Sequence, residues 1–407
     1  MESLKIALVS DWFFPSVGGI EYHIHDLATH LVEMGHEVHV ITRFGNYPDE
    51  KLPYDVHRFR GRVTMDSFHV SIGTDALKQI NELYKMEHFD VTHGHSIYSP
   101  LAVGVANLSA GIRGIPSVIT NHSLLGDSIL NPAYITLLRI SLRKVSSFIA
   151  VSRAVEGDTR SILGRNLGKR EIYTIPNGID ADFWEPPEDK EELKESLGLK
   201  GVVVATTSRL TKRKRVHVIP AIAKSVKEEH GENMTFLIIG DGPERETIER
   251  LIRQYRVEDT VKLLGRQPRE KVREYLQASD VYLSPTIYEA FGIAALEALA
   301  CGVPVVANNH GGISEVVEHG KTGLVSQDDG ELVQNLMALI DDEEMREEMG
   351  KNARKSVEDR FSWEAVIPEV LDVYERTMNR GGGNPFLLYR FHQALKRGVA
   401  DAGVFNL

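Results

Sequence analysis

The sequence of 407 residues has a single cysteine, Cys301, which excludes an intramolecular disulfide and suits a reducing compartment. Cys301 lies where a helical pattern gives way to a strand, so we expect a small buried thiol and not a nucleophile. No apolar run approaches the roughly 18 residues needed to cross a bilayer. Residues 5–10 read as a short strand, so we also expect no signal peptide. These absences predict a cytoplasmic protein, either free or held peripherally at the inner membrane face.

The sequence also lacks a net positive charge. The formal net charge is -11, which argues against nucleic acid as a partner. One stretch departs from this balance, because nine Lys or Arg residues between positions 113 and 170 face only three acids. An anionic lipid or membrane surface fits this stretch, and so does an ordinary solvated face. The sequence leaves both interpretations open.

Short apolar runs alternate with helical patterns along the chain, which predicts α/β domains with parallel sheets. The pattern breaks at 177–192, where turn formers, prolines and acids gather. We therefore predict two domains, 1–185 and 190–360, whose strands end at a shared cleft. A helix at 361–380 is expected to pack back on the first domain, before a hinge and amphipathic tail at 381–407. The predicted strands are 5–10, 37–43, 91–95, 116–120, 147–152 and 171–176 in the first half, and 201–208, 235–240, 261–265, 281–285, 304–308 and 322–326 in the second.

The first strand is not followed by the three spaced glycines of a dinucleotide fingerprint, which argues against a dehydrogenase. Instead, Gly18 and Gly19 open a helical pattern. Paired glycines at this point let the backbone approach a phosphate, and the helix N-terminus offers free N–H groups. A simple tight turn is the alternative.

Two carboxylates, Glu289 and Glu297, stand eight residues apart around a helix-forming run. On or beside one helix, this spacing places them about 12 Å apart. They are too far apart to share one reacting atom, but they suit the two ends of a long ligand such as a nucleotide sugar.

A loop at 209–215 carries five cations in seven residues, directly after the first predicted strand of the second half. These cations repel one another unless an anion lies among them. The planar fork of Arg209 and the point charge of Lys214 suit a diphosphate. A solvated basic loop is the alternative.

His93, His95 and His122 end two neighbouring strand patterns, so we expect them to face the cleft. A metal cluster would normally bring a carboxylate at ligand spacing as well, and none is evident, so no metal is expected. Asp180 and Asp182 imitate the Asp-x-Asp of metal-dependent sugar transferases, but they lie in a turn and a structural role is expected.

Together these motifs resemble the retaining GT-B glycosyltransferases of family 4, over nearly the whole chain to about residue 380. The glutamate pair with the Glu-Ala-Phe-Gly run at 289–292 is the most specific of them. Within the family, residues 10–31 and 120–127 most resemble the phosphatidylinositol N-acetylglucosaminyltransferase branch, and bacterial phosphatidylinositol mannosyltransferases share the plan more loosely. The other matching motifs are 18–21, 121–123, 175–180, the Arg209/Lys214 pair, 240–243 and 311–312.

The resemblance implies the GT-B architecture, with two Rossmann-like domains facing a central cleft. The first domain would lie on the acceptor side and the second would bind the nucleotide sugar. Catalytic roles would fall to His122, near the reacting carbon, and to Glu289, which would hold hydroxyls of the donor sugar. The donor would be bound by Gly18, Gly19, Arg209 and Lys214 at the diphosphate, by the backbone at Phe291, Gly292 and Ile293, and by Glu297 at the ribose. The acceptor would meet Glu21, with Trp12 or Phe14.

The resemblance further implies transfer with retention, without metal or cofactor, from UDP-N-acetylglucosamine as the first choice of donor. The acceptor hydroxyl would belong to a phospholipid or polyprenyl-phosphate head group. The alternatives are a GDP-mannose-dependent mannosyltransferase, a UDP-sugar 2-epimerase and a non-catalytic nucleotide-sugar-binding subunit. One departure is visible: the family commonly has glycine after the lysine of the cationic loop, and this chain has Arg215, which questions the fine geometry of the loop but not its charge.

Overall fold

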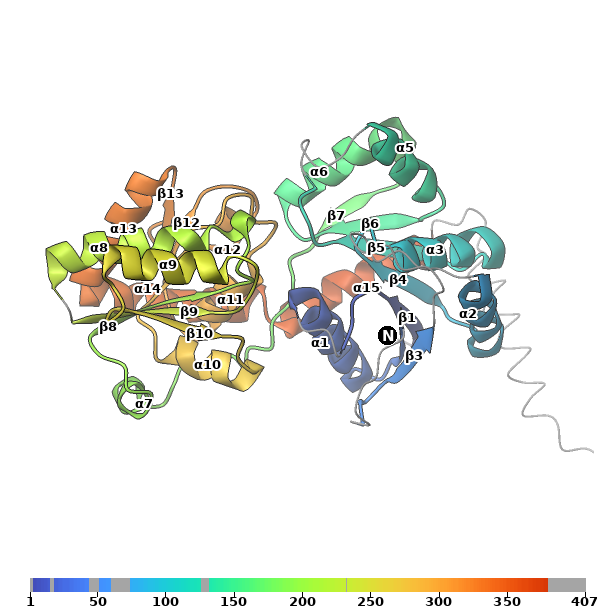
Figure 1. The fold of residues 1–407 in the computed structure, drawn as a ribbon. Coiled ribbons are helices and arrows are strands. Elements are labelled where there is room, and N and C mark those ends of the chain that lie inside the picture. The colour runs from blue at the N-terminus through green and yellow to red at the C-terminus, as the bar shows by residue number, and fades with distance from the viewer. Residues whose placement is uncertain are drawn as a thin grey trace, which may run out of the picture.

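The computed structural model describes residues 3–14, 18–43, 51–59, 74–125, 132–231 and 233–379, which form two parallel sheets with helices packed against them (Figure 1). The first sheet has seven strands in the order β3-β2-β1-β4-β5-β6-β7. Its strands are β1 (Lys5–Val9), β2 (Glu37–Arg43), β3 (Asp55–Phe59), β4 (Val91–His95), β5 (Ser117–Asn121), β6 (Ser147–Ala150) and β7 (Ile172–Thr174). Its helices are α1 (Gly19–Glu33), α2 (Thr74–Glu87), α3 (Pro100–Leu108), α5 (Pro132–Ser141) and α6 (Arg153–Leu163).

The second sheet has six strands in the order β10-β9-β8-β11-β12-β13. Its strands are β8 (Val202–Thr207), β9 (Met234–Ile239), β10 (Val261–Gly265), β11 (Val281–Ser284), β12 (Val305–Asn308) and β13 (Gly323–Ser326). The helices of this half are α7 (Lys190–Ser196), α8 (Ile219–His230), α9 (Arg245–Tyr255), α10 (Arg269–Gln277), α11 (Ile293–Ala300), α12 (Ile313–Val316), α13 (Asp329–Asp341) and α14 (Glu343–Arg360), and the chain continues into α15 (Trp363–Asn379).

All twelve predicted strands are present, which confirms the predicted α/β class. Inner strands such as β9 and β11 have every residue buried, because helices cover both faces of a parallel sheet. The prediction missed β3, which pairs only with β2 at the edge of the first sheet. An edge strand needs no continuous apolar run, and four of the five β3 residues are only partly buried.

Helix α15 completes the core of the first sheet, although its sequence follows the second. Figure 1 shows α15 in orange-red beside α1, within the half of the molecule that holds β1 and β4. Its apolar side chains Val366, Val370 and Tyr374 share one core with residues of β1 and α1. The Tyr374 hydroxyl also hydrogen bonds to Nδ1 of His93 on β4, at 2.7 Å.

The chain crosses between the two sheets twice, and the two crossings touch. The backbone N–H of Ile179, in the first crossing, donates to the carbonyl oxygen of Phe361 in the second, at 2.8 Å. Beside this bond, Trp363 is fully buried against the backbone of Gly178. A Cβ on Gly178 would lie 2.4 Å from the Trp363 ring, so only glycine allows this approach.

One sequence prediction falls outside the described residues: the hinge and amphipathic tail at 381–407. Across the part of the chain that the structure covers, every helix is too short or too polar to span a bilayer.

Replacing Gly178 with alanine should destabilise the protein, because the added methyl group must displace a fully buried Trp363. We expect a loss of about 1–3 kcal/mol in the free energy of unfolding, measured by urea denaturation. Gly157→Ala is the matched control, because Gly157 lies exposed in α6 with open space around it. That variant should gain about 0.5–1 kcal/mol. Equal stability of Gly178→Ala and the parent would mean that the two crossings separate freely.

Candidate active site

A cavity of about 320 Å³ lies where the two sheets face each other. Loops that follow β1 and β5 of the first sheet line it on one side, and the ends of β8 and β11 with the start of α11 line it on the other. The carboxyl ends of strands from both halves therefore meet at one pocket, as a ligand site in parallel sheets requires. The structure brings together here the ten residues that the sequence assigned to catalysis and donor binding: Gly18, Gly19, His122, Arg209, Lys214, Glu289, Phe291, Gly292, Ile293 and Glu297.

The glycine pair lies at a close approach between the two halves. Gly19 is the first residue of α1, and a Cβ built on it would lie 3.1 Å from the Cδ1 atom of Ile293, the first residue of α11. Two helix N-termini thus point toward the same pocket from opposite halves. Their unpaired N–H groups make this end of the pocket favourable for an anion.

Glu289 is held in place just before α11. Its carboxylate accepts from Nζ of Lys214 at 2.6 Å, and its backbone forms a bridge with Gly311. The turn into the helix is made by Gly292, with a φ of 103° that favours glycine. Glu297 lies in the second turn of the helix, so the two carboxylates line the same pocket from different positions along it.

The cationic loop keeps one guanidinium available for a ligand. The side chain of Arg209 lines the pocket and makes no hydrogen bond or ion pair with any residue that the structure describes. Arg215 explains the departure from the family pattern, because its φ of 54° is the left-handed conformation that a glycine would take. Its guanidinium is fixed by two hydrogen bonds to the Asp329 carboxylate, at 2.9 and 2.5 Å. At Arg215 the loop therefore keeps the backbone conformation of a glycine, and the ion pair with Asp329 helps to stabilise it.

Burial changes the chemistry of Glu297. The desolvation of its carboxylate raises the pKa to about 7, and nearby Arg269 offsets only part of that rise. Arg269 comes from α10 in the second half and forms a two-point ion pair with Asp26 on α1 in the first, at 3.1 and 2.8 Å. The guanidinium also lies over the rings of Tyr22 and Phe183, at 4.6 and 4.7 Å.

The Asp26–Arg269 pair was not predicted from the sequence. Arg269 lies in a highly charged helix and Asp26 in an amphipathic one, so neither stands out by spacing or composition. Their partnership depends on how the two halves face each other, which no local pattern encodes.

Of the three predicted cleft histidines, only His122 lines the pocket. The prediction for His93 and His95 is wrong, because both side chains point into the first domain and are almost fully buried. Nε2 of His93 bonds to the Thr120 hydroxyl at 2.6 Å, and Nδ1 of His95 contacts Nε2 of His122 at 3.1 Å. Burial lowers the pKa of His93 to about 3 and that of His122 to about 4, so both rings are neutral at physiological pH.

The predicted acceptor residues Glu21 and Trp12 are not among the residues that line the pocket. Trp12 packs against Tyr98, with ring centroids 5.5 Å apart, and the carboxylate of Glu21 reaches toward Gly18. The Asp180 carboxylate accepts from the backbone of Asp182 at 3.1 Å, which is the geometry of a turn and agrees with a structural role.

Comparison with known proteins decides the family. A family model described as "Glycosyltransferase Family 4" matches residues 17–183, and one described as "Glycosyl transferases group 1" matches residues 189–356. The chain is also 30% identical to a phosphatidylinositol N-acetylglucosaminyltransferase subunit of Arabidopsis thaliana, with 99% of this chain and 88% of that protein covered. This chain is a family 4 glycosyltransferase.

A second relative of this glycosyltransferase is the N-acetyl-alpha-D-glucosaminyl L-malate synthase of Bacillus anthracis, at 31% identity over 91% of this chain and 96% of that protein. Among solved structures, Anabaena HepE in complex with UDP and glucose superposes with a TM-score of 0.76 at 21% identity, covering 92% of this chain and all of that one. The glycosyltransferase therefore has the predicted GT-B fold, and the recognition from sequence is confirmed.

The raised pKa of Glu297 predicts a dependence of stability on pH. Because its pKa in the folded glycosyltransferase, about 7, lies above the ordinary 4.5, the folded state holds an extra proton between these values. The free energy of unfolding should then fall as the pH rises from 4.5 to 7. Glu297→Gln removes this loss. Above pH 7 its free energy of unfolding should be higher than that of the parent by on the order of 2–3 kcal/mol, and near pH 4 the two values should be equal.

Denaturant titrations at several pH values measure this difference. Glu246→Gln, which neutralises an exposed carboxylate on α9, is the control and should change little at any pH. If Glu297→Gln tracks the parent at every pH, the carboxylate is solvated and its pKa is ordinary.

Proposed function

We propose that this glycosyltransferase moves N-acetylglucosamine from UDP-N-acetylglucosamine to an acceptor hydroxyl, with retention and without a metal. The observation that carries the proposal is a pocket that combines an unpaired guanidinium, an ion-paired Lys214 and Glu289, and two helix N-termini. The choice of sugar is supported by two relatives whose names both specify N-acetylglucosaminyl transfer, although to different acceptors.

The diphosphate of the donor is the leaving group, and its developing charge needs positive partners. Arg209 can bind two phosphate oxygens through its planar fork, and Lys214 adds a point charge. The N–H groups at the starts of α1 and α11 add oriented dipoles. These groups would do the work of a metal ion in stabilising the leaving group.

The ion pair between Lys214 and Glu289 gives the pocket a way to respond to the donor. In the ligand-free protein the two charges satisfy each other at 2.6 Å. An arriving diphosphate competes for Lys214 and frees the Glu289 carboxylate to accept from hydroxyls of the sugar. Both groups keep a polar partner in either state, which avoids leaving a buried polar group without a hydrogen bond.

The remaining residues fit the other parts of the donor and acceptor. Glu297, in the wall of the pocket, would accept from the ribose hydroxyls, and neutral His122 would face the sugar. Glu21, whose carboxylate reaches toward Gly18, would contact the acceptor, and so would Trp12. The acceptor hydroxyl would attack on the face that the diphosphate leaves, with a phosphate oxygen taking its proton.

A donor titration tests this proposal. Bound donor raises the melting temperature by mass action, so we expect UDP-N-acetylglucosamine to stabilise the protein in the presence of EDTA. Arg209→Ala should weaken that shift. It should also lower kcat/KM by an amount that corresponds to a loss of roughly 2–4 kcal/mol of transition-state stabilisation. Lys212→Ala is the matched control, because Lys212 belongs to the same loop but lies exposed and outside the pocket.

Other outcomes of the titration favour the alternatives. A shift with GDP-mannose alone would support a mannosyltransferase, and conversion of the donor without any acceptor would support an epimerase. Donor binding without turnover on any acceptor would support a binding subunit. No shift with any nucleotide, or equal loss in Arg209→Ala and Lys212→Ala, contradicts the assignment of the pocket.

For the acceptor we propose a phospholipid head group presented by an anionic membrane. The support is a patch on and after α5, where Leu137 and Ile140 are 58% and 62% exposed and the cations Arg143 and Lys144 follow. Exposed apolar side chains next to cations are what an interfacial helix presents to a membrane. The glycosyltransferase would then act as a peripheral protein at the inner membrane face.

Vesicle binding separates a membrane acceptor from a soluble one. We expect the protein to sediment with vesicles that contain phosphatidylinositol and not with neutral vesicles, and to transfer N-acetylglucosamine to the lipid. Replacing both Leu137 and Ile140 with serine should weaken sedimentation by about 10-fold or more, since each side chain loses most of its apolar contact. Met86→Ser, which removes an exposed methionine from α2, is the control. Transfer to L-malate with no transfer to lipid would overturn the membrane proposal and leave the donor assignment intact.

A further inference from the structure

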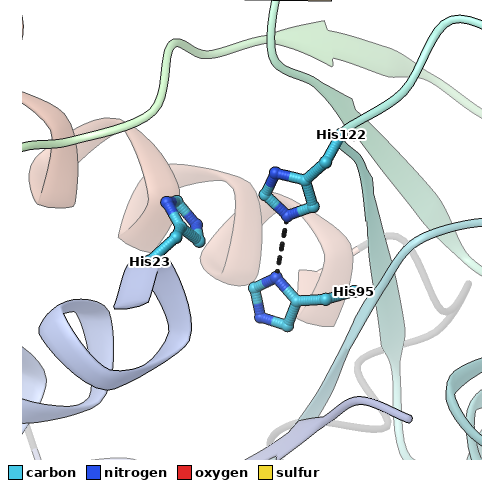
Figure 2. A group of neighbouring side chains, drawn as sticks. All are labelled: His23, His95 and His122. Carbon is cyan, nitrogen blue, oxygen red and sulfur yellow. Dashed lines mark hydrogen bonds between the residues drawn. The ribbon is translucent and has the colours of Figure 1, made fainter. Parts of the chain in front are cut away.

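Behind the pocket, three histidines from separate elements surround one space (Figure 2). His23 comes from α1, His95 from the end of β4, and His122 follows β5. One ring nitrogen of each lies within 4.8 Å of a ring nitrogen of both others. All three side chains are at least nine-tenths buried, so the space is shielded from bulk water.

The polar atoms of this cluster are not accounted for by protein contacts. The Nδ1 atom of His23 and the Nε2 atom of His95 are buried without a hydrogen-bond partner in the described structure. Burial of an unpaired polar atom costs about 1–3 kcal/mol, and a ligand that binds Nδ1 of His23 would remove that cost for this atom. A neutral imidazole carries one nitrogen lone pair, so each of the three rings can supply one ligand atom to an ion.

We propose that His23, His95 and His122 form a binding site for a divalent transition-metal ion of the zinc class. With metal–nitrogen distances of about 2.0–2.1 Å, tetrahedral coordination places ligand nitrogens about 3.3 Å apart. The His95–His122 pair already meets this spacing at 3.1 Å. A rotation of the His23 ring that brings its nitrogen closer to this pair would complete a three-histidine set, with the fourth position left to water.

The chemistry of the cluster selects the ion. A set of neutral imidazoles suits Zn²⁺, Co²⁺ or Cu²⁺ and does not suit Mg²⁺ or Ca²⁺, which prefer oxygen ligands. His122 also lines the pocket, which gives an ion a route to the cluster. The ion has no part in the proposed transfer step, and its binding is a property of the ligand-free protein that stands or falls separately from the proposed function.

A second group of possible ligands, Glu37, His39 and Glu87, is a poorer candidate. Nζ of Lys5 binds the carboxylates of Glu37 and Glu87, each at 2.6 Å. An ammonium group thus already occupies the place that a metal would take. This group serves as the control for adventitious binding.

Cobalt titration of the full, chelator-stripped chain tests the site, because Co²⁺ held by three imidazoles in a near-tetrahedral site absorbs strongly in the visible range. We expect one tight site in the parent. His23→Gln and His95→Gln should bind on the order of 100-fold more weakly and lose the absorption, while His39→Gln keeps both. Equal binding by the parent and His23→Gln, or loss of the site only in His39→Gln, would overturn the proposal.

A measurement on the unaltered chain guards against misfolded variants. X-ray absorption at the zinc edge of the Zn²⁺-loaded parent should show three imidazole ligands. Fewer than three imidazoles, or a shell made mainly of carboxylate oxygen, would contradict the site whatever the variants do. Bound Zn²⁺ should also raise the melting temperature of the parent and not that of His95→Gln.

Discussion

The contact between the two interdomain crossings is the constraint on which the rest of the molecule depends. The Ile179–Phe361 hydrogen bond and the Trp363 ring on Gly178 fix where the second sheet begins relative to the first. Because both sheets are parallel and wound in the same sense, fixing this point brings the carboxyl ends of their strands to face each other. Every feature of the pocket follows from that placement, including the meeting of two helix N-termini across it.

Two ion pairs in the cleft have different roles. Asp26 and Arg269 connect the halves, and aromatic rings cover the guanidinium, so this pair holds the two halves together. Lys214 and Glu289 lie in the wall of the pocket itself, on one half only. The first pair is satisfied by the fold, and the second can exchange its partners for a ligand. The burial that strengthens the first pair also raises the pKa of Glu297 beside it.

The sequence predicted those parts of the fold and site that depend on local pattern. Buried strands can be recognised in the sequence as apolar runs. Gly18, Arg209 and Glu289 lie just after such strands or just before helices, so their placement at the edge of a sheet could be predicted. The edge strand β3 lacks an apolar run, and the Asp26–Arg269 pair depends on the orientation of two halves. His93 and His95 were misplaced because a strand end does not tell which face a side chain takes, and Tyr374 of helix α15 packs against His93.

The position of α15 has a consequence for how the chain is made. Ribosomes release a protein from its first residue onward, so the β1 to β7 region emerges long before Trp363. Its core stays incomplete until α15 arrives, because Val370, Leu371 and Tyr374 are part of it. The second half, encoded later, has an apolar cluster made entirely of its own residues. The half that is synthesised first is therefore the last to close, and its uncovered apolar surface is what chaperones would meet during synthesis.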